Sequence, residues 1–249
     1  MENKKTEIDI ILPNYNSSEF IDETIKSVLN QNFKNWRLII IDDYSDIKTR
    51  KKIKGYEKFK KIKVFWLKKN KGAAYCRNFA ISKSKSKYLA FLDSDDIWKK
   101  NKLKLQLQYM KKNNYDFTYT YYETFGLQSR KIIPPENFDF ERFIKNTSIA
   151  TSTMMIKRTA TKNIKFTHTA ICEDYHFKCK ILKKVKFAYC LKKYLTKYKI
   201  RKNSLQSRKL KNFYWIWKIN SRYNRLTFFE NLNSLCHISL NSIKKYGFK

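Results

Sequence analysis

The feature of this sequence that most restricts its fold is an apolar run that ends abruptly in acids. Residues 88–92 have the length and composition of a buried strand, and Asp93, Asp95 and Asp96 follow directly. In open α/β sheets, ligands bind outside the carboxyl ends of the strands. Acids gathered there repel one another, and Mg²⁺ is typically held by one or two carboxylates together with substrate phosphates. The run therefore predicts a divalent-cation site, whereas the simpler alternative is a solvated turn in which Asp95 or Asp96 caps the next helix.

Earlier apolar runs repeat this arrangement and alternate with helical patterns. We expect strands at residues 8–12, 37–41 and 63–67. The second of these runs also ends in acids, Asp42 and Asp43. Strands that alternate with helices fold into a parallel sheet of right-handed βαβ units. The sequence thus predicts an α/β fold with a mostly parallel central sheet and carboxylates of two strands at one edge.

The downstream half continues with less regular patterns. The expected elements are strands at 116–122, 151–156 and 186–189 and a basic, polar loop at 197–207. Between the last two strands, Glu173 and Asp174 begin a predicted helix that runs to about residue 184. Acids in the first turn of a helix are stabilised by the helix dipole, so this pair also has a purely structural interpretation.

The charge balance is strongly basic. The 249 residues include 55 Lys and Arg against 21 Asp and Glu, a formal net charge of +34. Such a field attracts polyanions, which include nucleic acid, nucleotide phosphates and an anionic membrane face. A solvated, lysine-rich surface accounts for part of the excess, and the remainder favours an anionic partner.

Cysteines and apolar runs indicate the compartment. The five cysteines are scattered without a Cys-x-x-Cys pair or zinc-like spacing, which predicts reduced thiols. Residues 1–7 are charged and lack the apolar core of a signal peptide, and no apolar run approaches the roughly 18 residues of a transmembrane helix. We expect a cytoplasmic protein whose contact with a membrane is peripheral.

Residues 208–249 differ in composition from the rest of the chain. Aromatic and aliphatic side chains are interleaved there with Lys and Arg, which predicts one or two helices with apolar and basic faces. Such helices either pack on the preceding domain or lie on the anionic cytoplasmic leaflet of a membrane, an interface that this composition favours. We expect a mixture, in which part of the extension packs and part touches lipid.

An ordered set of short motifs spans most of the chain. It comprises IILPNYN at 10–16, SVLNQ at 27–31, IIIDDYSD at 39–46, NKGAAYCRN at 70–78, FLDSDD at 91–96 and ED at 173–174. In this order and spacing the motifs resemble the family 2 glycosyltransferases of the GT-A fold, over roughly residues 7–207. The resemblance implies a Rossmann-like GT-A fold that binds a nucleotide-sugar donor. The extension that follows resembles the tails of bacterial surface-polysaccharide and lipopolysaccharide transferases.

The resemblance also implies roles in donor binding for individual residues. Asp43 matches the acid that hydrogen-bonds the nucleotide base, and Tyr15 matches the aromatic residue that stacks on it. Pro13 lies at the same turn and would contribute main-chain contacts. Arg77 matches a basic residue near the nucleotide.

Metal and catalytic roles follow from two further matches. Asp93 would face the ribose or the metal, and Asp95 would bind the metal, Mn²⁺ or Mg²⁺, that bridges the two phosphates and neutralises the leaving nucleoside diphosphate. Asp174 matches the general base that takes the proton of the acceptor hydroxyl. Direct attack would then invert the anomeric centre without a covalent intermediate.

The protein that this resemblance implies is an inverting, metal-dependent glycosyltransferase. It would move a sugar, from a UDP-sugar, to a lipid-linked bacterial surface glycan such as lipopolysaccharide, lipooligosaccharide or capsule, at the cytoplasmic face of the inner membrane. We expect a catalytic domain at 1–207, with a nucleotide-binding half at 1–115 and an acceptor-binding half at 116–207. Residues 208–249 would form a basic, aromatic helical extension that contacts the membrane surface.

Two other classes of protein fit parts of the sequence. A nucleic-acid-binding protein would use the charge and the basic, aromatic extension, but it leaves the ordered acids unexplained, since they repel phosphate without a metal. A catalytically inactive scaffold on the same fold is disfavoured by the intact acids Asp43, Asp93, Asp95 and Asp174.

The sequence departs from the family pattern at two places. Tyr44 stands where the family often has Gly, and a bulky residue there can alter the backbone near the base. Residues 198–204 lack the His that relatives tend to have two positions after an Arg. Any phosphate or metal contact from this loop would therefore be electrostatic, from Lys199 or Arg201.

Overall fold

Four parallel strands form the first half of the molecule. The computed structural model describes residues 6–201 and 209–246 of the chain. The strands pair in the order β3-β2-β1-β4; they are β1 (Ile8–Asn14), β2 (Trp36–Asp42), β3 (Ile62–Trp66) and β4 (Tyr88–Phe91). All four strands predicted for this region are confirmed. Continuous apolar runs are typical of parallel strands whose two faces are covered by helices.

Helices follow the first three strands. They are α1 (Ile21–Leu29), α2 (Ile47–Lys54) and α3 (Gly72–Lys83). In α1 the buried residues Ile21, Ile25 and Val28 recur at helical spacing and pack against the sheet. Crossovers of this kind keep the strands parallel, so the carboxyl ends of β1, β2 and β4 meet at one edge of the sheet.

A short strand separates the acids after β4 from the next helix. This strand is β5 (Ile97–Trp98), and helix α4 (Lys102–Lys112) follows it. The N-cap of α4 is Asn101, which makes no side-chain capping bond. The alternative in which Asp95 or Asp96 caps the following helix is therefore wrong, because the chain first turns to pair β5 with a distant strand.

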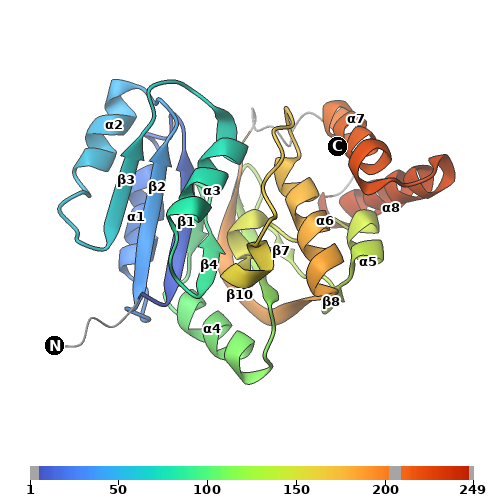
Figure 1. Ribbon diagram of the computed structural model, residues 1–249, viewed down its shortest axis with the longest axis horizontal. Coiled ribbons are helices and arrows are strands. Elements are labelled where there is room, and N and C mark those ends of the chain that lie inside the picture. Colours follow the sequence, from blue (N-terminus) through green and yellow to red (C-terminus); the bar gives the residue numbers. More distant parts are fainter. Residues whose placement is uncertain (1–5, 202–208, 247–249) are drawn as a thin grey trace.

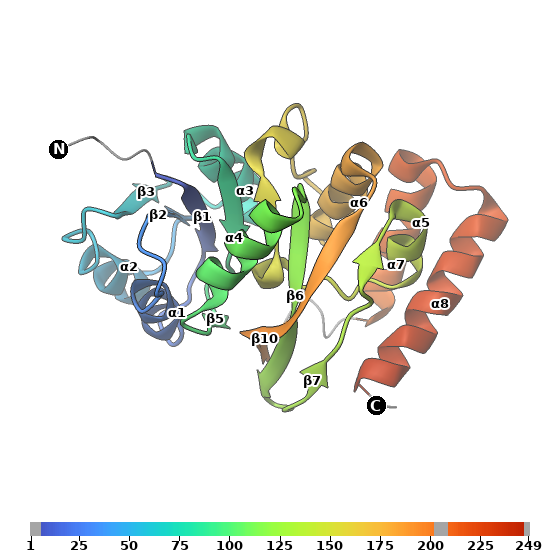
Figure 2. The same ribbon diagram turned by 90° about the horizontal axis from the view of Figure 1, so that it is seen from below.

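The second half of the molecule extends the same sheet with mixed pairing. Its strands are β6 (Phe117–Gly126), β7 (Lys131–Ile132), β8 (Asn137–Phe138), β9 (Met155–Lys157) and β10 (Ala188–Ile200). Strand β9 lies antiparallel to both β4 and β6, and β10 lies parallel to β6. The result is one ten-stranded sheet whose main path is β3-β2-β1-β4-β9-β6-β10-β5 (Figure 2). The predicted α/β class is confirmed, and its longest ladders are parallel.

Two predictions for this half are corrected. The first half of the strand expected at 151–156 is instead a 3₁₀ turn, η1 (Thr151–Thr153), in which the Thr153 hydroxyl donates to the carbonyl of Ala150 at 2.6 Å. Hydroxyl side chains offer the backbone such local alternatives to a ladder. The strand expected at 186–189 begins at Ala188 and continues to Ile200, because β6 and β5 pair with it there, so the first four residues of the loop predicted at 197–207 are strand instead. Of the predicted loop, residues 202–207 lie outside the described residues.

The remaining helices cover the second half and form the C-terminal extension. They are α5 (Phe140–Lys145), η2 (Arg158–Thr161), α6 (Glu173–Val185), α7 (Lys209–Ile219), the π-helical segment η4 (Asn220–Asn224) and α8 (Phe228–Tyr246). Helices α7 and α8 stand beside α5 and α6, at the end of the molecule opposite α2 (Figure 1). The predicted helical extension is confirmed. None of the described helices combines the length and the apolar composition needed to span a bilayer.

The core lies on both faces of the sheet. Successive residues of a strand point to opposite faces: Ile10 packs with α1 and α4, whereas Ile11 packs with α3 and α6. The extension joins the second of these layers through three buried residues, Ile216, Ile219 and Ile238. The C-terminal extension therefore packs in part on the rest of the molecule, as the first of the two interpretations predicts.

Candidate active site

The carboxyl ends of β1, β2 and β4 form the edge that carries the predicted acids. Asn14 stands opposite Asp42 in the ladder, and its Nδ2 donates to Asp42 Oδ1 at 2.9 Å. Asp42 is fully buried, accepts the N–H of Ser45 and lies 3.3 Å from Nε of Arg50. These partners belong to β1, to the loop after β2 and to α2. Asp42 therefore stabilises the loop after β2 and is shielded from any ligand.

The next acid, Asp43, holds the start of α3. Its Oδ1 accepts the N–H of Lys71 at 2.6 Å, and its Oδ2 accepts the N–H of Gly72 at 2.8 Å. Such bonds satisfy helix N–H groups that have no partner within the helix. Gly72 has φ +82°, a left-handed conformation that favours glycine. Asp43 thus has a structural role that the sequence did not predict, while its predicted contact with a base remains a prediction.

Two exposed aromatic rings flank Asp43. Tyr15 follows β1 with 53% of its surface exposed, and Tyr44 follows β2 with 55% exposed, whereas Asp43 itself is only 3% exposed. Pro13 is buried within β1, opposite Ile41. Tyr44 adopts φ +64°, which explains why glycine suits this position: the departure from the family pattern is accommodated in a strained, left-handed backbone. The exposed rings offer a planar ligand a surface on which to stack.

A buried arginine joins the acids after β4 to those at the start of α6. Arg77 of α3 donates from Nη2 to Asp93 Oδ1 and from Nη1 to Glu173 Oε1, both at 2.7 Å. Its guanidinium also lies over the ring of Phe166, at 5.3 Å from the centroid. Burial opposes the charge, but Asp93 and Glu173 outweigh it and raise the pKa of Arg77. Arg77, which the resemblance placed near the nucleotide, therefore connects the segment after β4 to α6 through two ion pairs.

Asp95 and Asp96 lie next to the basic end of β10. Asp95 Oδ2 is 2.7 Å from Nη2 of Arg201, and Asp96 Oδ1 accepts the main-chain N–H of Lys199 at 2.8 Å. Burial raises the pKa of Asp95, which Arg201 offsets in part and Asp93 raises further. Burial, followed by repulsion from Asp95 and Asp93, raises the pKa of Asp96 well above its usual range. Within the described chain, Oδ2 of Asp96 is buried without a hydrogen-bond partner.

Asp174 sits in the first turn of α6 beside a buried cation. Its Oδ2 accepts from Nζ of Lys178 at 2.7 Å and from the hydroxyl of Thr151 at 3.0 Å. The Asp174 side chain keeps 32% of its surface exposed, whereas that of Lys178 keeps only 4%. Burial alone would raise the pKa of Asp174, but Lys178 and then Arg77 outweigh it and hold that pKa well below its usual range. Asp174 is therefore an ionised acceptor that remains open to a ligand.

The η1 turn brings the two acidic groups together. Thr151 binds the side chain of Asp174, and the hydroxyl of the next residue, Ser152, accepts the main-chain N–H of Asp93 at 3.0 Å. Arg77 forms a second, independent bridge between β4 and α6. The structure thus brings Asp93 and Asp174 together, and Asp95 follows Asp93 by two positions; the roles predicted for the three acids remain predictions.

The donor set of this edge fits a divalent cation that is shared with a diphosphate. No group of three or more His, Cys, Asp or Glu side chains that could enclose a metal occurs within residues 6–201 and 209–246. Mg²⁺ does not need such a cage, because it usually takes one or two carboxylates and completes its shell with phosphate oxygens and water. Burial is the largest cause of the raised pKa of Asp95, and repulsion from Asp93 adds to it although Arg201 lies beside Asp95. A cation relieves this repulsion.

Several contributors to the site were not predicted from the sequence. Glu173 anchors Arg77, Lys178 pairs with Asp174, and Ser152 orients Asp93. Only the Asp174–Lys178 pair had a local signal, since residues four apart on a helix are neighbours. Arg77 and Glu173 are 96 positions apart, a separation that no local pattern bridges.

Comparisons with known proteins place these features in a family. A family model described as "Glycosyl transferase family 2" matches residues 9–186. The chain is 35% identical to TuaG of Bacillus subtilis (strain 168), named as a glycosyltransferase of teichuronic acid biosynthesis, over 98% of this chain and 99% of TuaG. It is 33% identical to Escherichia coli WfgD, named UDP-Glc:alpha-D-GlcNAc-diphosphoundecaprenol beta-1,3-glucosyltransferase, over 97% of this chain and 95% of WfgD.

Solved structures share the fold. S. aureus TarS in complex with UDP-GlcNAc matches with a TM-score of 0.76 at 20% identity, over 98% of this chain and 73% of that chain. The mannosyltransferase PcManGT from Pyrobaculum calidifontis, in complex with GDP-Man and Mn²⁺, matches with a TM-score of 0.70 at 11% identity, over 96% of this chain and 76% of that chain. These matches confirm the predicted GT-A architecture.

Proposed function

Because this chain belongs to glycosyl transferase family 2, we propose that it moves a sugar from a UDP-sugar to a lipid-linked glycan of the bacterial surface, with inversion at the anomeric carbon. That it is a glycosyltransferase follows from the family and from relatives similar along nearly its whole length. The donor and the acceptor are inferred from the name of WfgD, which specifies UDP-Glc and alpha-D-GlcNAc-diphosphoundecaprenol. We place the reaction at the cytoplasmic face of the membrane.

The proposed donor lies across the carboxyl ends of β1, β2 and β4. Its base stacks on exposed Tyr15, beside Asp43 and the main chain around Pro13. The bonds from Asp43 to the start of α3 support this arrangement, because they fix the carboxylate before any ligand arrives.

The diphosphate of the donor lies against the acids after β4 and the end of β10. Asp93 and Asp95 would hold a divalent cation, Mn²⁺ or Mg²⁺, together with the phosphate oxygens. When bound, such a cation supplies positive charge that stabilises the leaving nucleoside diphosphate. Arg201, which is paired with Asp95, is a basic side chain that lies beside this proposed phosphate position. The binding of a cation by Asp95 would free the guanidinium to contact a phosphate.

Asp174 takes the proton from the acceptor hydroxyl. An ionised carboxylate can accept a proton as the new glycosidic bond forms, and Lys178 keeps this carboxylate ionised and in place. Thr151 binds Asp174 and the adjacent Ser152 binds Asp93, while Arg77 links Asp93 to Glu173, the residue before Asp174. This double connection is the observation that carries the proposal. The connection holds Asp174, the proposed general base for the acceptor, next to Asp93, an acid on the donor side of the site.

The test is sugar transfer by the full-length protein from a panel of UDP-sugars to a synthetic GlcNAc-diphosphate-lipid acceptor with Mn²⁺. We expect one preferred donor and a product whose anomeric configuration, read by NMR, is opposite to that of the donor. Asp174→Asn should still bind the donor but lose roughly 10²- to 10⁴-fold in kcat, the range typical of a general base.

The matched control is Glu141→Gln, which neutralises an exposed acid on α5 and should leave kcat unchanged. A product that retains the configuration of the donor would contradict inversion. An Asp174→Asn variant that turns over like the wild type would remove Asp174 from the mechanism. Failure to use any UDP-sugar would refute the proposed donor.

A further inference from the structure

Helix α8 is held on the protein through polar side chains. Asn231 and Ser234 are fully buried, and Nδ2 of Asn220 lies 3.2 Å from both Oδ1 of Asn231 and Oγ of Ser234. Ser234 Oγ donates to the carbonyl of Ile144 at 2.6 Å, and the hydroxyl of Tyr175 donates to Asn220 at 2.7 Å. Satisfied buried networks of this kind specify one packing arrangement. They fix which side of α8 is turned toward the protein.

The opposite side of α8 is apolar and exposed. This outer face consists of Phe229, Leu232, Cys236 and Leu240, which recur at helical spacing. Phe229 has 79% of its surface exposed and Leu240 has 56%. A surface helix usually turns its apolar stripe toward the core and its polar residues toward solvent. Helix α8 turns Ile238 and Leu235 toward the core, but it also buries Asn231 and Ser234 and leaves a second apolar stripe in solvent. Contiguous exposed apolar surface of this kind marks a site of interaction.

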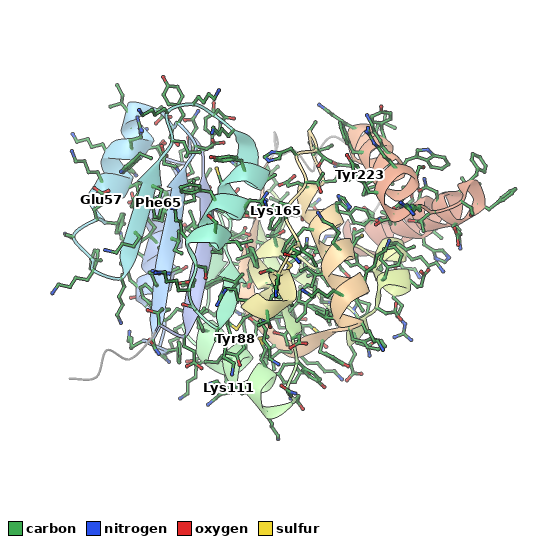
Figure 3. The ribbon with its side chains drawn as sticks, viewed as in Figure 1. Glu57, Phe65, Tyr88, Lys111, Lys165 and Tyr223 are labelled. Carbon is green, nitrogen blue, oxygen red and sulfur yellow. The ribbon has the colours of Figure 1, made fainter. Side chains whose placement is uncertain are left out.

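Aromatic side chains extend the outer face at the turn between α7 and α8. Phe228 is 63% exposed, and its ring meets those of Trp217 and Phe229 at centroid distances of 5.4 Å and 5.7 Å. This turn lies at the extremity of the molecule (Figure 1). The other side of the extension is packed: Tyr223 lies beside α6, where its ring meets that of His176 at 4.7 Å (Figure 3). The aromatic side chains of this turn therefore project from the protein, while the opposite side of the extension is packed against α6.

The stretch of sequence that carries the outer face is strongly basic. Glu230 is the only acid in the sequence between residues 209 and 246, and the main-chain N–H of Thr227 already donates to it at 2.7 Å. The basic residues of the same stretch are Lys209, Lys211, Lys218, Arg222, Arg225, Lys244 and Lys245. A second copy of this chain, with a formal net charge of +34, would be repelled from this surface. Anionic lipid headgroups would be attracted to it.

We propose that the outer face of α8 docks on an anionic lipid bilayer. The apolar side chains enter the headgroup level, and the exposed Arg222 and Arg225 contact lipid phosphates. Docking orients the active site as well, because Tyr175, which binds the α8 network through Asn220, directly follows Asp174. The proposal goes beyond the proposed function and is tested without donor or acceptor, so either can fail while the other stands.

The test is flotation of the full-length protein with vesicles of phosphatidylcholine, alone or mixed with phosphatidylglycerol. The wild type should float only with the mixed vesicles, and less at high salt. Phe229→Ser/Leu240→Ser should weaken binding at least about tenfold, because both apolar contacts are lost. Arg222→Gln/Arg225→Gln should weaken it by about tenfold or more, since each basic residue near the surface contributes. Ile47→Ser is the matched control, because Ile47 is 86% exposed on α2, at the opposite end.

Three outcomes would overturn the proposal. The first is a wild type that floats with neither vesicle or equally with both. The second is a Phe229→Ser/Leu240→Ser variant that binds as the wild type does, or that loses no more binding than Ile47→Ser. The third is a wild type that is dimeric by sedimentation, does not float, and becomes monomeric on that double substitution. This last result would assign the outer face to a second copy of the chain.

Discussion

At the scale of single residues, the state of the proposed base is set by its neighbour one turn along α6. Asp174 lies 2.7 Å from the ammonium of Lys178, whose side chain is almost completely buried. Burial favours the neutral acid, but the ion pair outweighs burial and keeps the pKa of Asp174 low. Lys178 is therefore a positioning residue, because it acts on the reaction through Asp174.

Replacement of Lys178 by Met should move the acid limb of the pH–kcat profile to higher pH by about one unit or more. The reason is that Asp174 accepts a proton only when ionised, and without the ammonium its partly buried carboxyl protonates at higher pH. Lys178→Arg should restore most of the wild-type profile, and the dissociation constant for UDP should not change in either variant. A Lys178→Met profile that superimposes on that of the wild type would show that the pair is only structural.

The sequence singled out the acids Asp93, Asp95 and Asp174 and the cations Arg77 and Arg201, but it did not predict the ion pairs between them. Asp93, Asp95 and Asp174 stand in motifs that can be read locally, because each follows a strand or begins a helix. Their partners Arg77 and Arg201 lie on other elements, and only the sheet order brings them near. A local pattern contains no information on such pairs.

At the scale of elements, helix α4 begins with a buried cation. Lys102 is fully buried, and its Nζ has no hydrogen-bond partner among residues 6–201 and 209–246. The ammonium lies 3.8 Å from the centroid of the Trp98 ring. Such a ring contact contributes up to about 2 kcal/mol, whereas removing an ion from water costs several kcal/mol. Burial accordingly lowers the pKa of Lys102 well below its usual value.

Lys102→Met should raise the free energy of unfolding at pH 7 by about 1–3 kcal/mol. Between the lowered pKa and the usual value of 10.5, the unfolded chain binds a proton that the folded protein does not, so wild-type stability rises with pH across this window. The advantage of the variant should therefore shrink toward zero as pH approaches 10.5. Urea unfolding at pH 7 and pH 10 measures it, with exposed Lys104→Met as the control. An equal difference at both pH values would contradict this account.

Periodicity predicted where the elements lie but not always how they face. The parallel strands could be predicted because short apolar runs alternate with helical patterns along residues 8–92. The apolar pattern of α8 indicated a helix correctly, but only part of it, including Ile238, faces the core, whereas Phe229 and Leu240 face outward. Asn231 and Ser234 are inside instead, because Asn220 and the carbonyl of Ile144 satisfy them. These hydrogen-bond partners lie outside α8, so the sequence of α8 alone could not predict which of its sides faces the core.

At the scale of the whole molecule, an acidic site is set into a basic protein. The formal net charge of +34 draws anions toward every surface. The carboxylates after β4 would repel a diphosphate on their own, and the arginines beside them are already paired with Asp93 and Asp95. The central claim is therefore that this edge accepts a nucleoside diphosphate only together with a divalent cation.

Calorimetric titration of the full-length protein with UDP tests that claim most directly. The wild type should bind UDP with Mn²⁺ and lose at least about tenfold in affinity with EDTA, because a cation shared by the carboxylates and the phosphates supplies most of the attraction. Asp95→Asn should lose the same affinity even with Mn²⁺, whereas Glu141→Gln should behave as the wild type. Equal binding with Mn²⁺ and EDTA, or unchanged binding by Asp95→Asn, would contradict the account.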